Sequence, residues 1–460
     1  AGSDDGLLHL TKDGGKNWEK ITPAGMPEWM MFNSVEFDPH TKGGIYVAGT
    51  RYKSGDYEPY LYKSKDYGKT WTKITDGIKA PHFTRVLRVD PKRAGLLYAG
   101  TEFGMYVSFD DGTSWKPFQL NLPKVPITDL TIKNNNLIAA TQGRSFWIID
   151  DLTSLHQLND NVANAAFHLF KPMPSYRMNG GQRTDSKTEG KNHPNGVMIH
   201  YYVKDTAKLT AALEILEMNG TVIKKFSTKP NKKAKDEELT VKPGFNRFNW
   251  NMRYANADGF DGLIMWGGGL AGPKAVPGKY KAKLTVGGQV QETEFEIVKD
   301  PRTEGSMEDI KAQFDFLILV RDKLSETNNA VKRIRSAREQ INRVTEPMKG
   351  KEEMKDVTEL AKTILADMKK VEEALYQTKN RSGQDPLNYP IRLNNKLAGL
   401  SREASGSDYR PTAQVKAVYQ EISGKIDEQL AILNKIINEE VPKLNTLVKQ
   451  KNVDAIVLSE

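Results

Sequence analysis

The stretch SKDYGKTW, Ser64–Trp71, has two close relatives elsewhere in the chain. They are TKDGGKNW, Thr11–Trp18, and SFDDGTSW, Ser108–Trp115, and all three fit the pattern S/T-x-D-x-G-x-x-W, here called the box. Self-similarity at a regular spacing is the sequence signature of a repeat architecture, in which each copy is one supersecondary unit. The three boxes therefore predict that a unit of roughly 40 to 50 residues recurs through the first part of the chain.

The box itself has the composition of a tight hairpin turn. Its aspartate side chain accepts hydrogen bonds from backbone N–H groups of the same turn, and its glycine supplies a position with positive φ. The tryptophan is expected to pack inward and anchor the hairpin. We therefore interpret the following box residues as structural: Asp13, Trp18, Asp66, Trp71, Asp110 and Trp115.

A fourth, degenerate copy is IIDDLTSL, Ile148–Leu155. When it is aligned with the third box, Asp150 takes the place of Asp110, whereas leucines replace the glycine and the tryptophan. We interpret Asp150 and Asp151 as an eroded structural turn rather than as a catalytic pair of carboxylates.

The repeated pattern resembles the Asp-box, or BNR repeat, of sialidases, xyloglucanase-type glycosidases and sortilin-type receptors. In those families each box lies on the hairpin between the third and fourth strands of a β-propeller blade. The resemblance implies that residues 1–160 form part of an Asp-box β-propeller built from four-stranded blades.

The chain enters this repeat part-way through a unit, because Ala1–Ser3 matches the AGT step that precedes the later boxes. We expect about three and a half blades, whereas closed propellers have roughly four to eight. The sequence therefore predicts the C-terminal portion of a longer protein, whose first partner is the N-terminal remainder of its own propeller.

Turns of an antiparallel blade alternate between two faces, so the loops after the AGT steps and the connections between blades lie opposite the boxes. These loops carry aromatic, arginine and carboxylate side chains, which together suit the binding of a peptide or a glycan. The alternative is that the aromatic rings fill the wedges between blades. The predicted ligand-binding face comprises Trp29, Phe32, Arg51, Tyr52, Tyr57, His82, Arg85, Phe103 and Arg144.

Catalysis is less well supported by the sequence. Glycoside hydrolysis normally uses two carboxyl groups that flank the scissile bond, and Asp56, Glu58 and Glu102 are candidates by position alone. A sialidase would also need an arginine cluster and a tyrosine nucleophile, and residues of the right types are Arg51, Arg85, Arg144 and Tyr52. The sequence contains no zinc-protease, serine-hydrolase, P-loop or EF-hand motif, and it predicts neither a metal site nor a cofactor.

Composition excludes several other classes of protein. The chain has 460 residues, of which 38% are hydrophobic and 27% charged, as expected for several globular domains. It has no cysteine for disulfides or thiol catalysis and no apolar run long enough to predict a membrane span. The net charge is +9, but basic and acidic residues are mixed, and no basic motif interleaved with aromatics predicts a nucleic-acid partner.

The box pattern stops near residue 160, and the fold class we predict is multidomain, mostly β and then α. Residues 161–195 are rich in proline, glycine, asparagine and lysine and predict a linker. Residues 196–302 predict a β-sandwich that resembles the Ig-like or fibronectin-like modules of bacterial surface proteins and hydrolases. Residues 303–460 carry apolar residues at a spacing of three to four and predict an antiparallel helical bundle.

Single residues refine this outline. Pro411 is well placed at the start of a helix, and Pro442 should kink or break the last turns of that helix. The connector 385–406 is expected to pack along one side of the bundle. The glycine-rich segment 258–278 is expected to fold back on its surroundings, with Trp266 as an anchor.

The order of propeller, sandwich and helices resembles a family of large bacterial proteins labelled glycosyl hydrolases or sortilin-like (VPS10-type) repeat proteins. Besides the boxes, the motifs that carry this resemblance are RSFWIIDD at 144–151, VPGKY at 276–280 and NYPIRLNNKLAGL at 388–400. The resemblance implies an exported protein, which is secreted, periplasmic or on the bacterial cell surface.

Three functions follow as hypotheses. The leading one is an exported binding or scaffold protein whose propeller face holds a peptide or glycan. The second is a glycoside hydrolase of the sialidase or xyloglucanase type, with its catalytic acids partly in the absent N-terminal blades. The third is a structural subunit of a cell-envelope assembly, whose partners would be other envelope proteins.

Overall fold

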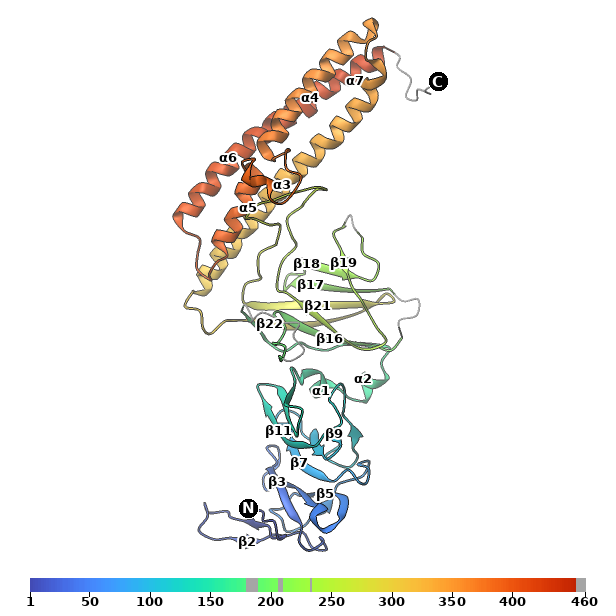
Figure 1. The fold of residues 1–460 in the computed structure, drawn as a ribbon, viewed down its shortest axis with the longest axis vertical. Helices are drawn as coiled ribbons and strands as arrows, with labels where there is room; N and C mark the ends of the chain where they lie inside the picture. Colours follow the sequence, from blue (N-terminus) through green and yellow to red (C-terminus); the bar gives the residue numbers. More distant parts are fainter. Residues whose placement is uncertain (179–188, 206–209, 232–233, 452–460) are drawn as a thin grey trace. The chain divides into compact units, whose positions relative to one another are not determined.

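The chain folds into two compact units, each with buried cores of its own (Figure 1). Unit 1 is Ala1–Met173 and consists mainly of β-sheets, whereas unit 2 is Pro174–Glu460 and holds further sheets followed by helices. The predicted order, mostly β and then α, is confirmed. The computed structural model describes residues 1–178, 189–205, 210–231 and 234–451.

Unit 1 contains a series of antiparallel sheets in chain order. Their strands are β1 His9–Leu10 and β2 Glu19–Lys20; β3 Met31–Phe37, β4 Ile45–Arg51, β5 Asp56–Ser64 and β6 Thr72–Lys73; β7 Thr84–Val89, β8 Leu97–Thr101, β9 Gly104–Ser108 and β10 Lys116–Pro117; and β11 Ile127–Lys133, β12 Asn136–Thr141 and β13 Phe146–Ile149. In the two four-stranded sheets each strand pairs with the next along the chain, which is the strand order of a propeller blade.

Consecutive sheets of unit 1 pack against one another. Strands β4, β8 and β9 are buried almost throughout and consist of runs such as LYAGT and GMYVS, because a sheet covered on both faces has no polar face. The first strand of each sheet contacts the first strand of the next sheet, so β3 contacts β7 and β7 contacts β11. Buried hydrophobic clusters lie between the sheets. The β-propeller arrangement predicted for this region is therefore present at the level of its blades.

The tryptophans of the second and third boxes join each sheet to the one before it. Trp71 Nε1 donates to the carbonyl of Ile21 at 2.8 Å, and Trp115 Nε1 donates to the carbonyl of Ile74 at 2.8 Å. Each acceptor lies three residues after the tryptophan of the preceding box. The sequence predicted that each ring anchors its own hairpin, but in the structure the rings of Trp71 and Trp115 also link neighbouring sheets.

The box glycines take part in the same contact. Gly68 and Gly112 have positive φ, and a Cβ on either would lie 2.7 Å from the side chain of the isoleucine that accepts the tryptophan bond. The first box differs, because Trp18 Nε1 donates to the Gly15 carbonyl of its own turn and the residue is 51% exposed. The contact between box and preceding sheet is thus made by the second and third boxes.

The box aspartates hold the turns closed. Asp66 accepts the backbone N–H and the hydroxyl of Thr70 at 2.9 and 2.6 Å. These bonds lower the pKa of Asp66 to about 2, so its carboxylate stays ionised in the folded protein. The equivalent partners, four positions after the aspartate, are Asn17 for Asp13 and Ser114 for Asp110.

The degenerate fourth copy replaces the last strand of a blade with a helix. Asp151 Oδ1 accepts from Asn135 Nδ2 at 3.1 Å and from the backbone N–H of Thr153 at 2.8 Å, whereas Asp150 makes no hydrogen bond through its side chain to the described residues. Helices α1 Thr153–Gln157 and α2 Asp160–Asn164 follow, then β14 Phe167–Leu169. The turn at this position is structural, but Asp151 rather than Asp150 makes its bonds.

Unit 2 begins with two layers of sheet. One is six-stranded, in the order β15-β22-β21-β17-β18-β19, and in the other β16 pairs with β20. Aromatic rings pack between the layers: Phe226 meets Phe248 at 4.5 Å, and Trp250 meets Phe295 at 6.0 Å. The strands are β15 Ser175–Arg177, β16 Val197–Val203, β17 Ala211–Glu217, β18 Val222–Ser227, β19 Glu237–Glu238, β20 Gly244–Trp250, β21 Gly278–Val286 and β22 Gln289–Lys299.

The edges of the six-stranded sheet depart from the prediction. Both edge strands, β15 and β19, run parallel to their neighbours, whereas an Ig-like sandwich is antiparallel. A β-sandwich is present, but its strand order does not support the Ig-like or fibronectin-like assignment. The predicted linker 161–195 also contains the strands β14 and β15, and β15 pairs with the distant strand β22, a contact that composition does not show. Residues 179–188 of this segment lie outside the described part.

The C-terminal helices form an antiparallel bundle, as predicted. They are α3 Met307–Thr345, α4 Lys355–Leu375, α5 Leu393–Ala404, α6 Ala413–Lys435 and α7 Val441–Gln450. Ser306 and Asp309 form a capping box at the start of α3. A π-helical turn, Ile436–Glu440, joins α6 to α7 directly before Pro442, whose missing N–H makes a regular helix unfavourable there.

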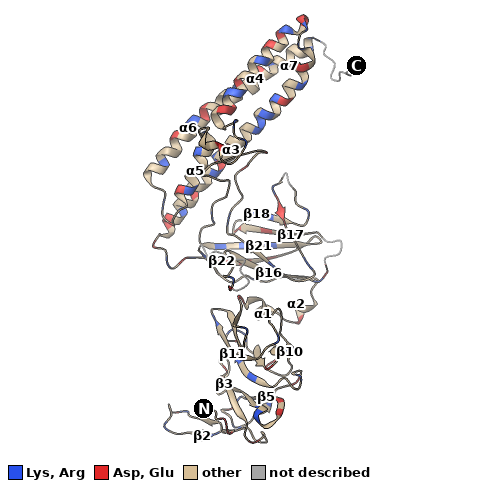
Figure 2. Ribbon diagram, in the orientation of Figure 1, with Lys and Arg blue, Asp and Glu red and all other residues tan. Residues whose placement is uncertain are grey.

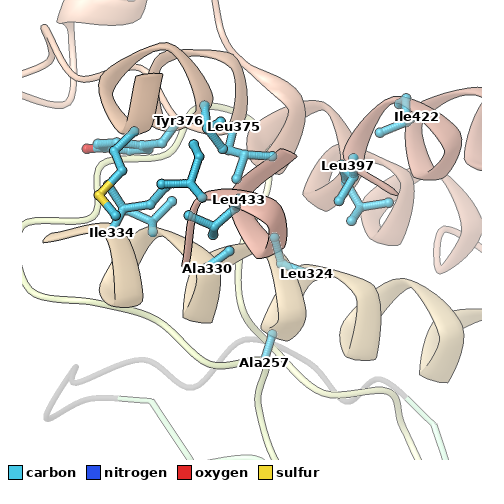
Figure 3. Close-up of a cluster of buried hydrophobic side chains, with 14 of the residues drawn as sticks. Ala257, Leu324, Ala330, Ile334, Leu375, Tyr376, Leu397, Ile422 and Leu433 are labelled. Carbon is cyan, nitrogen blue, oxygen red and sulfur yellow. The ribbon is translucent and has the colours of Figure 1, made fainter. Parts of the chain in front are cut away.

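The connector 385–406 is more central than predicted, because it contains α5. Leu397 and Ala398 of this helix are fully buried, and Figure 3 shows Leu397 among core residues of the other helices. The glycine-rich segment 258–278 packs against the same bundle: Asn395 pairs with the backbone N–H and carbonyl of Trp266 at 2.6 and 2.5 Å. The anchor at Trp266 is thus its backbone, and its ring stays partly exposed.

Charged side chains of both signs alternate along the helices of unit 2 (Figure 2). Such mixing is typical of solvated helix faces. In the described ranges, every helix is too short or too polar to cross a lipid bilayer.

The contact between box and preceding sheet predicts unequal costs for removing equivalent tryptophans. Trp115 is 3% exposed and holds Ile74, so Trp115→Ala should destabilise unit 1 by about 3–5 kcal/mol. Trp18→Ala, in the first box, should cost less than about 1 kcal/mol. Urea-dependent hydrogen exchange of unit 1 peptides measures both, and equal losses would contradict the role of the inter-sheet bond.

Candidate functional site

The strand register places the predicted binding loops together at one end of the sheets of unit 1. Strand β4 ends at Arg51 and β5 begins at Asp56, so the short turn Tyr52–Ser54 lies between them, while the other end of β5 leads into the second box. In the next sheet Thr84 pairs with Thr101 at the same end. The loops of adjacent sheets therefore emerge opposite the boxes.

Phe83 is the centre of an aromatic group at this end. Its ring stacks on Tyr52 with centroids 5.3 Å apart, and Tyr57 lies against it at 6.1 Å. The Arg85 guanidinium lies over the rings of Phe83 and Tyr52, 5.2 and 5.7 Å from their centroids. Phe83 is buried and Tyr57 is 50% exposed, so the group has a fixed base and an accessible edge.

A second group forms around His82. Its ring lies 4.9 Å from that of Phe103, which is 45% exposed, and its Nδ1 lies 2.8 Å from the Tyr106 hydroxyl. Burial, with Lys79 and Lys124 nearby, lowers the pKa of His82, so the imidazole is neutral at pH 7. Burial also raises the pKa of Tyr106, which keeps its proton and can donate to Nδ1. In that arrangement Nε2 carries the imidazole proton.

The two groups are continuous. The backbone N–H of Glu102 donates to the carbonyl of Phe83 at 3.1 Å and fixes one loop against the other. The rings of both groups are called the aromatic platform below: Tyr52, Tyr57, His82, Phe83 and Phe103.

Both arginines beside the platform are paired with carboxylates. Arg51 Nη1 bonds Asp56 Oδ2 at 2.9 Å, and Arg85 Nε bonds Glu102 Oε2 at 2.7 Å. These four side chains are mostly buried, so each pair holds its geometry and neutralises its own charge. The two arginines therefore add little net charge beside the platform, and Lys79 and Lys124 are the cations that act on His82.

Three residues of the predicted face lie apart from the platform. Trp29 is 68% exposed on a backbone with φ of 58° and contacts none of the platform rings. Phe32 packs into the hydrophobic cluster of the first sheets, because Gly2 leaves room for its ring. Arg144 is exposed and donates to the carbonyl of Gly143 in its own loop. Loop position alone did not reveal which side chains point inward.

The predicted catalytic carboxyls do not form an acid–base pair. Burial would raise the pKa of Asp56, but hydrogen bonds from Tyr60 and Arg51 hold it below its usual range. Glu102 is bound to Arg85, and Glu58 is exposed at the edge of β5. A general acid needs a raised pKa, so Asp56 does not suit that role and Glu102 already serves an ion pair.

A different pair of carboxyls lies on the first strands of the two sheets that flank the sheet of Arg88. Arg88 Nη2 bonds Asp129 Oδ1 at 2.7 Å, and its Nη1 lies 3.5 Å from Glu36 Oε2. Burial raises the pKa of Glu36 despite the opposing charge of Arg88, and Asp129 adds to the rise. Glu36 and Asp129 thus differ in environment, which is the arrangement that separates an acid from a base.

Sequence reasoning missed Tyr106 and the carboxyls around Arg88 as site residues. Tyr106 lies in the buried strand GMYVS and Glu36 in β3, where strand patterning gives no functional signal. Glu36 acquires its partner Arg88 from the neighbouring sheet, and Tyr106 acquires its partner His82 from the segment before β7. Among the described residues, His, Asp and Glu nowhere gather in groups of three or more that could hold a metal ion.

Comparison with known proteins gives short, partial similarities. A probable oligoxyloglucan-reducing end-specific xyloglucanase of Neosartorya fischeri is 29% identical over 99 residues, and its counterpart in Emericella nidulans is 27% identical over 99 residues. The match covers 21% of this chain and 12% of each relative. No protein-family model matches the chain.

Solved structures are similar over limited regions as well. They include YCF48 from Cyanidioschyzon merolae (22% identity, 32% of this chain and 47% of that one, TM-score 0.24) and the GH74 xyloglucanase from Xanthomonas campestris (18%, 32% and 24%, TM-score 0.26). The GH74 enzyme of Niastella koreensis is 13% identical and covers 64% of this chain and 51% of its own, with a TM-score of 0.27.

The raised pKa of Glu36 predicts a stability change with a defined pH dependence. Because the folded protein disfavours the ionised carboxylate, Glu36→Gln should stabilise unit 1 at pH 7, and the gain should disappear below about pH 4, where Glu36 is protonated in both the folded and unfolded states. Urea unfolding across this pH range measures it. The exposed Glu28→Gln is the control, and a destabilised Glu36→Gln at pH 7 would contradict the assignment.

Proposed function

We propose that the aromatic platform of unit 1 binds a neutral glycan chain. The observation that carries this proposal is the exposed edge of Tyr57 and Phe103 on a base fixed by Phe83. A sugar ring presents a face of C–H groups to an aromatic ring, and its hydroxyls need a few placed polar partners. The imidazole of His82 is such a partner beside the rings.

The pairing of the arginines favours a neutral ligand over an anionic one. A sialoside carries a carboxylate that calls for an arginine without a carboxylate partner, whereas Arg51 and Arg85 are held by Asp56 and Glu102. The partial similarity to proteins named oligoxyloglucan-specific xyloglucanases supports the same choice of a neutral glycan. A peptide is the competing ligand, and the experiment below includes it.

The wider setting belongs to the same proposal. The three boxes and the blade-like sheets support an Asp-box propeller of the sortilin-like type, completed by an N-terminal remainder of the propeller. The protein would act as an exported binding or scaffold protein, and other envelope proteins would be its macromolecular partners.

Glycan binding is tested by isothermal titration with xyloglucan oligosaccharides. Tyr57→Ala and Phe103→Ala should each raise Kd about tenfold, because each removes an exposed stacking surface worth about 1.4 kcal/mol. Phe37→Ala is the matched control, since Phe37 is similarly exposed at the opposite end of β3. Sialyllactose and an unstructured peptide serve as competitors, and tighter binding of either would refute a neutral glycan.

A second candidate function is glycoside hydrolysis through Glu36 and Asp129. The raised pKa of Glu36, with Asp129 on the far side of Arg88, is the specific observation that favours it. Glycosidases use two carboxyls in different protonation states, one as the acid and the other as base or nucleophile. Here Glu36 would be the acid and Asp129 the second carboxyl.

Release of reducing sugars from xyloglucan tests this second candidate. If it is correct, Glu36→Gln and Asp129→Asn should each lower turnover at least 100-fold, as expected for loss of general acid–base catalysis. Glu102→Gln should change turnover far less, because Glu102 pairs with Arg85. Undetectable turnover by the unmodified chain would leave glycan binding as the function of unit 1.

A further inference from the structure

Unit 2 contains a cavity of about 600 Å³ that neither the platform nor the core uses. From the sandwich side its walls are β15, Arg253 and the end of the glycine-rich segment, which contains Lys274. From the helical side they are α3 and the segment after α5. Its volume falls within the range of small-molecule sites, roughly 300–1,000 Å³. Among the described residues, four cationic side chains line it: Arg177, Arg253, Lys274 and Arg302.

Arg177 is fixed rigidly at this cavity. It is 6% exposed, its Nε donates to the carbonyl of Ala275 at 2.9 Å, and its Nη2 lies 3.4 Å from Gln313 Oε1. Its Nη1 forms an ion pair with Asp408. A guanidinium held from both sides is ordered before any ligand arrives, so binding costs little further side-chain entropy.

Two further cations converge on Arg177. Arg253 Nη1 donates to the carbonyl of Gly272 at 2.8 Å, and Lys274 Nζ donates to the carbonyl of Met178 at 2.8 Å. Burial lowers the pKa of Lys274 to about 8, and the charges of Arg177 and Arg253 contribute to the change. Burial and Arg177 likewise lower the pKa of Arg253. Like charges are thus held together in a partly buried place, at a cost that an anion would relieve.

Each carboxylate of the cavity has a partner of its own. Asp300 accepts from Arg302 Nε and Nη2 at 2.9 and 2.7 Å, and Asp408 is bound to Arg177. Glu304 lies 3.5 Å from the Tyr409 hydroxyl. Among the described lining residues, the four cationic side chains outnumber the three carboxylates Asp300, Glu304 and Asp408.

We propose that this cavity binds a small molecule through a phosphate or carboxylate group, placed among Arg177, Arg253 and Lys274. Planar guanidinium groups match the geometry of such oxyanions, and the lysine adds a compact charge. Because the walls come from both the sandwich and the helices, the ligand would join these two parts of unit 2. This site is independent of the platform in unit 1.

Titration of the full chain with sodium sulfate and sodium phosphate, at constant ionic strength against chloride, tests the site. Both oxyanions should bind, and Arg253→Gln and Lys274→Met should each raise Kd at least tenfold. Lys279→Met is the matched control, because Lys279 is an exposed lysine nearby on β21. Circular dichroism establishes that each variant is folded.

A second readout follows from Lys274 and separates a specific site from general charge screening. At pH 8 sulfate, which does not itself titrate there, should be bound with uptake of up to about half a proton, because the anion raises the pKa of Lys274. The uptake is seen as a dependence of the binding heat on buffer ionisation, and Lys274→Met should abolish it. The other charged groups at the cavity are Arg177, Arg253, Asp300, Arg302, Glu304 and Asp408.

The affinities of glucose 6-phosphate and glucuronate are then compared. The ligand that binds more tightly shows whether the site prefers a phosphate or a carboxylate group. Equal and weak responses of the unmodified protein to sulfate, phosphate and chloride would overturn the proposal. So would oxyanion binding that both Arg253→Gln and Lys274→Met leave unchanged, because that result would place the anion elsewhere.

Discussion

The hydrogen bond from a box tryptophan to an isoleucine carbonyl of the preceding sheet is the contact on which unit 1 depends. Trp71 and Trp115 each make it at 2.8 Å, and the box glycine lets the same isoleucine approach closely. A turn that only closed its own hairpin would not position the next sheet. Because the indole N–H reaches backward, the second and third repeats each fix the sheet that came before them.

Because the boxes join the sheets at one end, the opposite end of the sheets is available for other chemistry. The loops there are joined by an aromatic stack around Phe83 and by ion pairs that use up the charges of Arg51 and Arg85. Whether an arginine is paired with a carboxylate decides what such a surface can recognise. A paired arginine holds rings in place, whereas an unpaired arginine would attract anions. In the cavity of unit 2 Arg177 is also paired, with Asp408, whereas Arg253 donates to a backbone carbonyl.

Much of the architecture could be predicted from local pattern. The boxes indicated blade-like sheets, and apolar spacing indicated the helices after residue 303. Elements that depend on distant partners were missed or misplaced. Strand β15 exists because it pairs with β22. Helix α5 is central because the longer helices α3 and α6 pack against it.

The sequence by itself determined the repeat, because a turn needs aspartate, glycine and tryptophan at fixed positions within a few residues. It also determined which loops share one end of the sheets, because strands alternate in direction. Only the tertiary structure decided which loop side chains form a site. Phe32 turned into the core, Glu102 was taken by Arg85, and Glu36 acquired its raised pKa from burial between sheets. Contacts between residues far apart in the chain set these outcomes, and no local pattern encodes them.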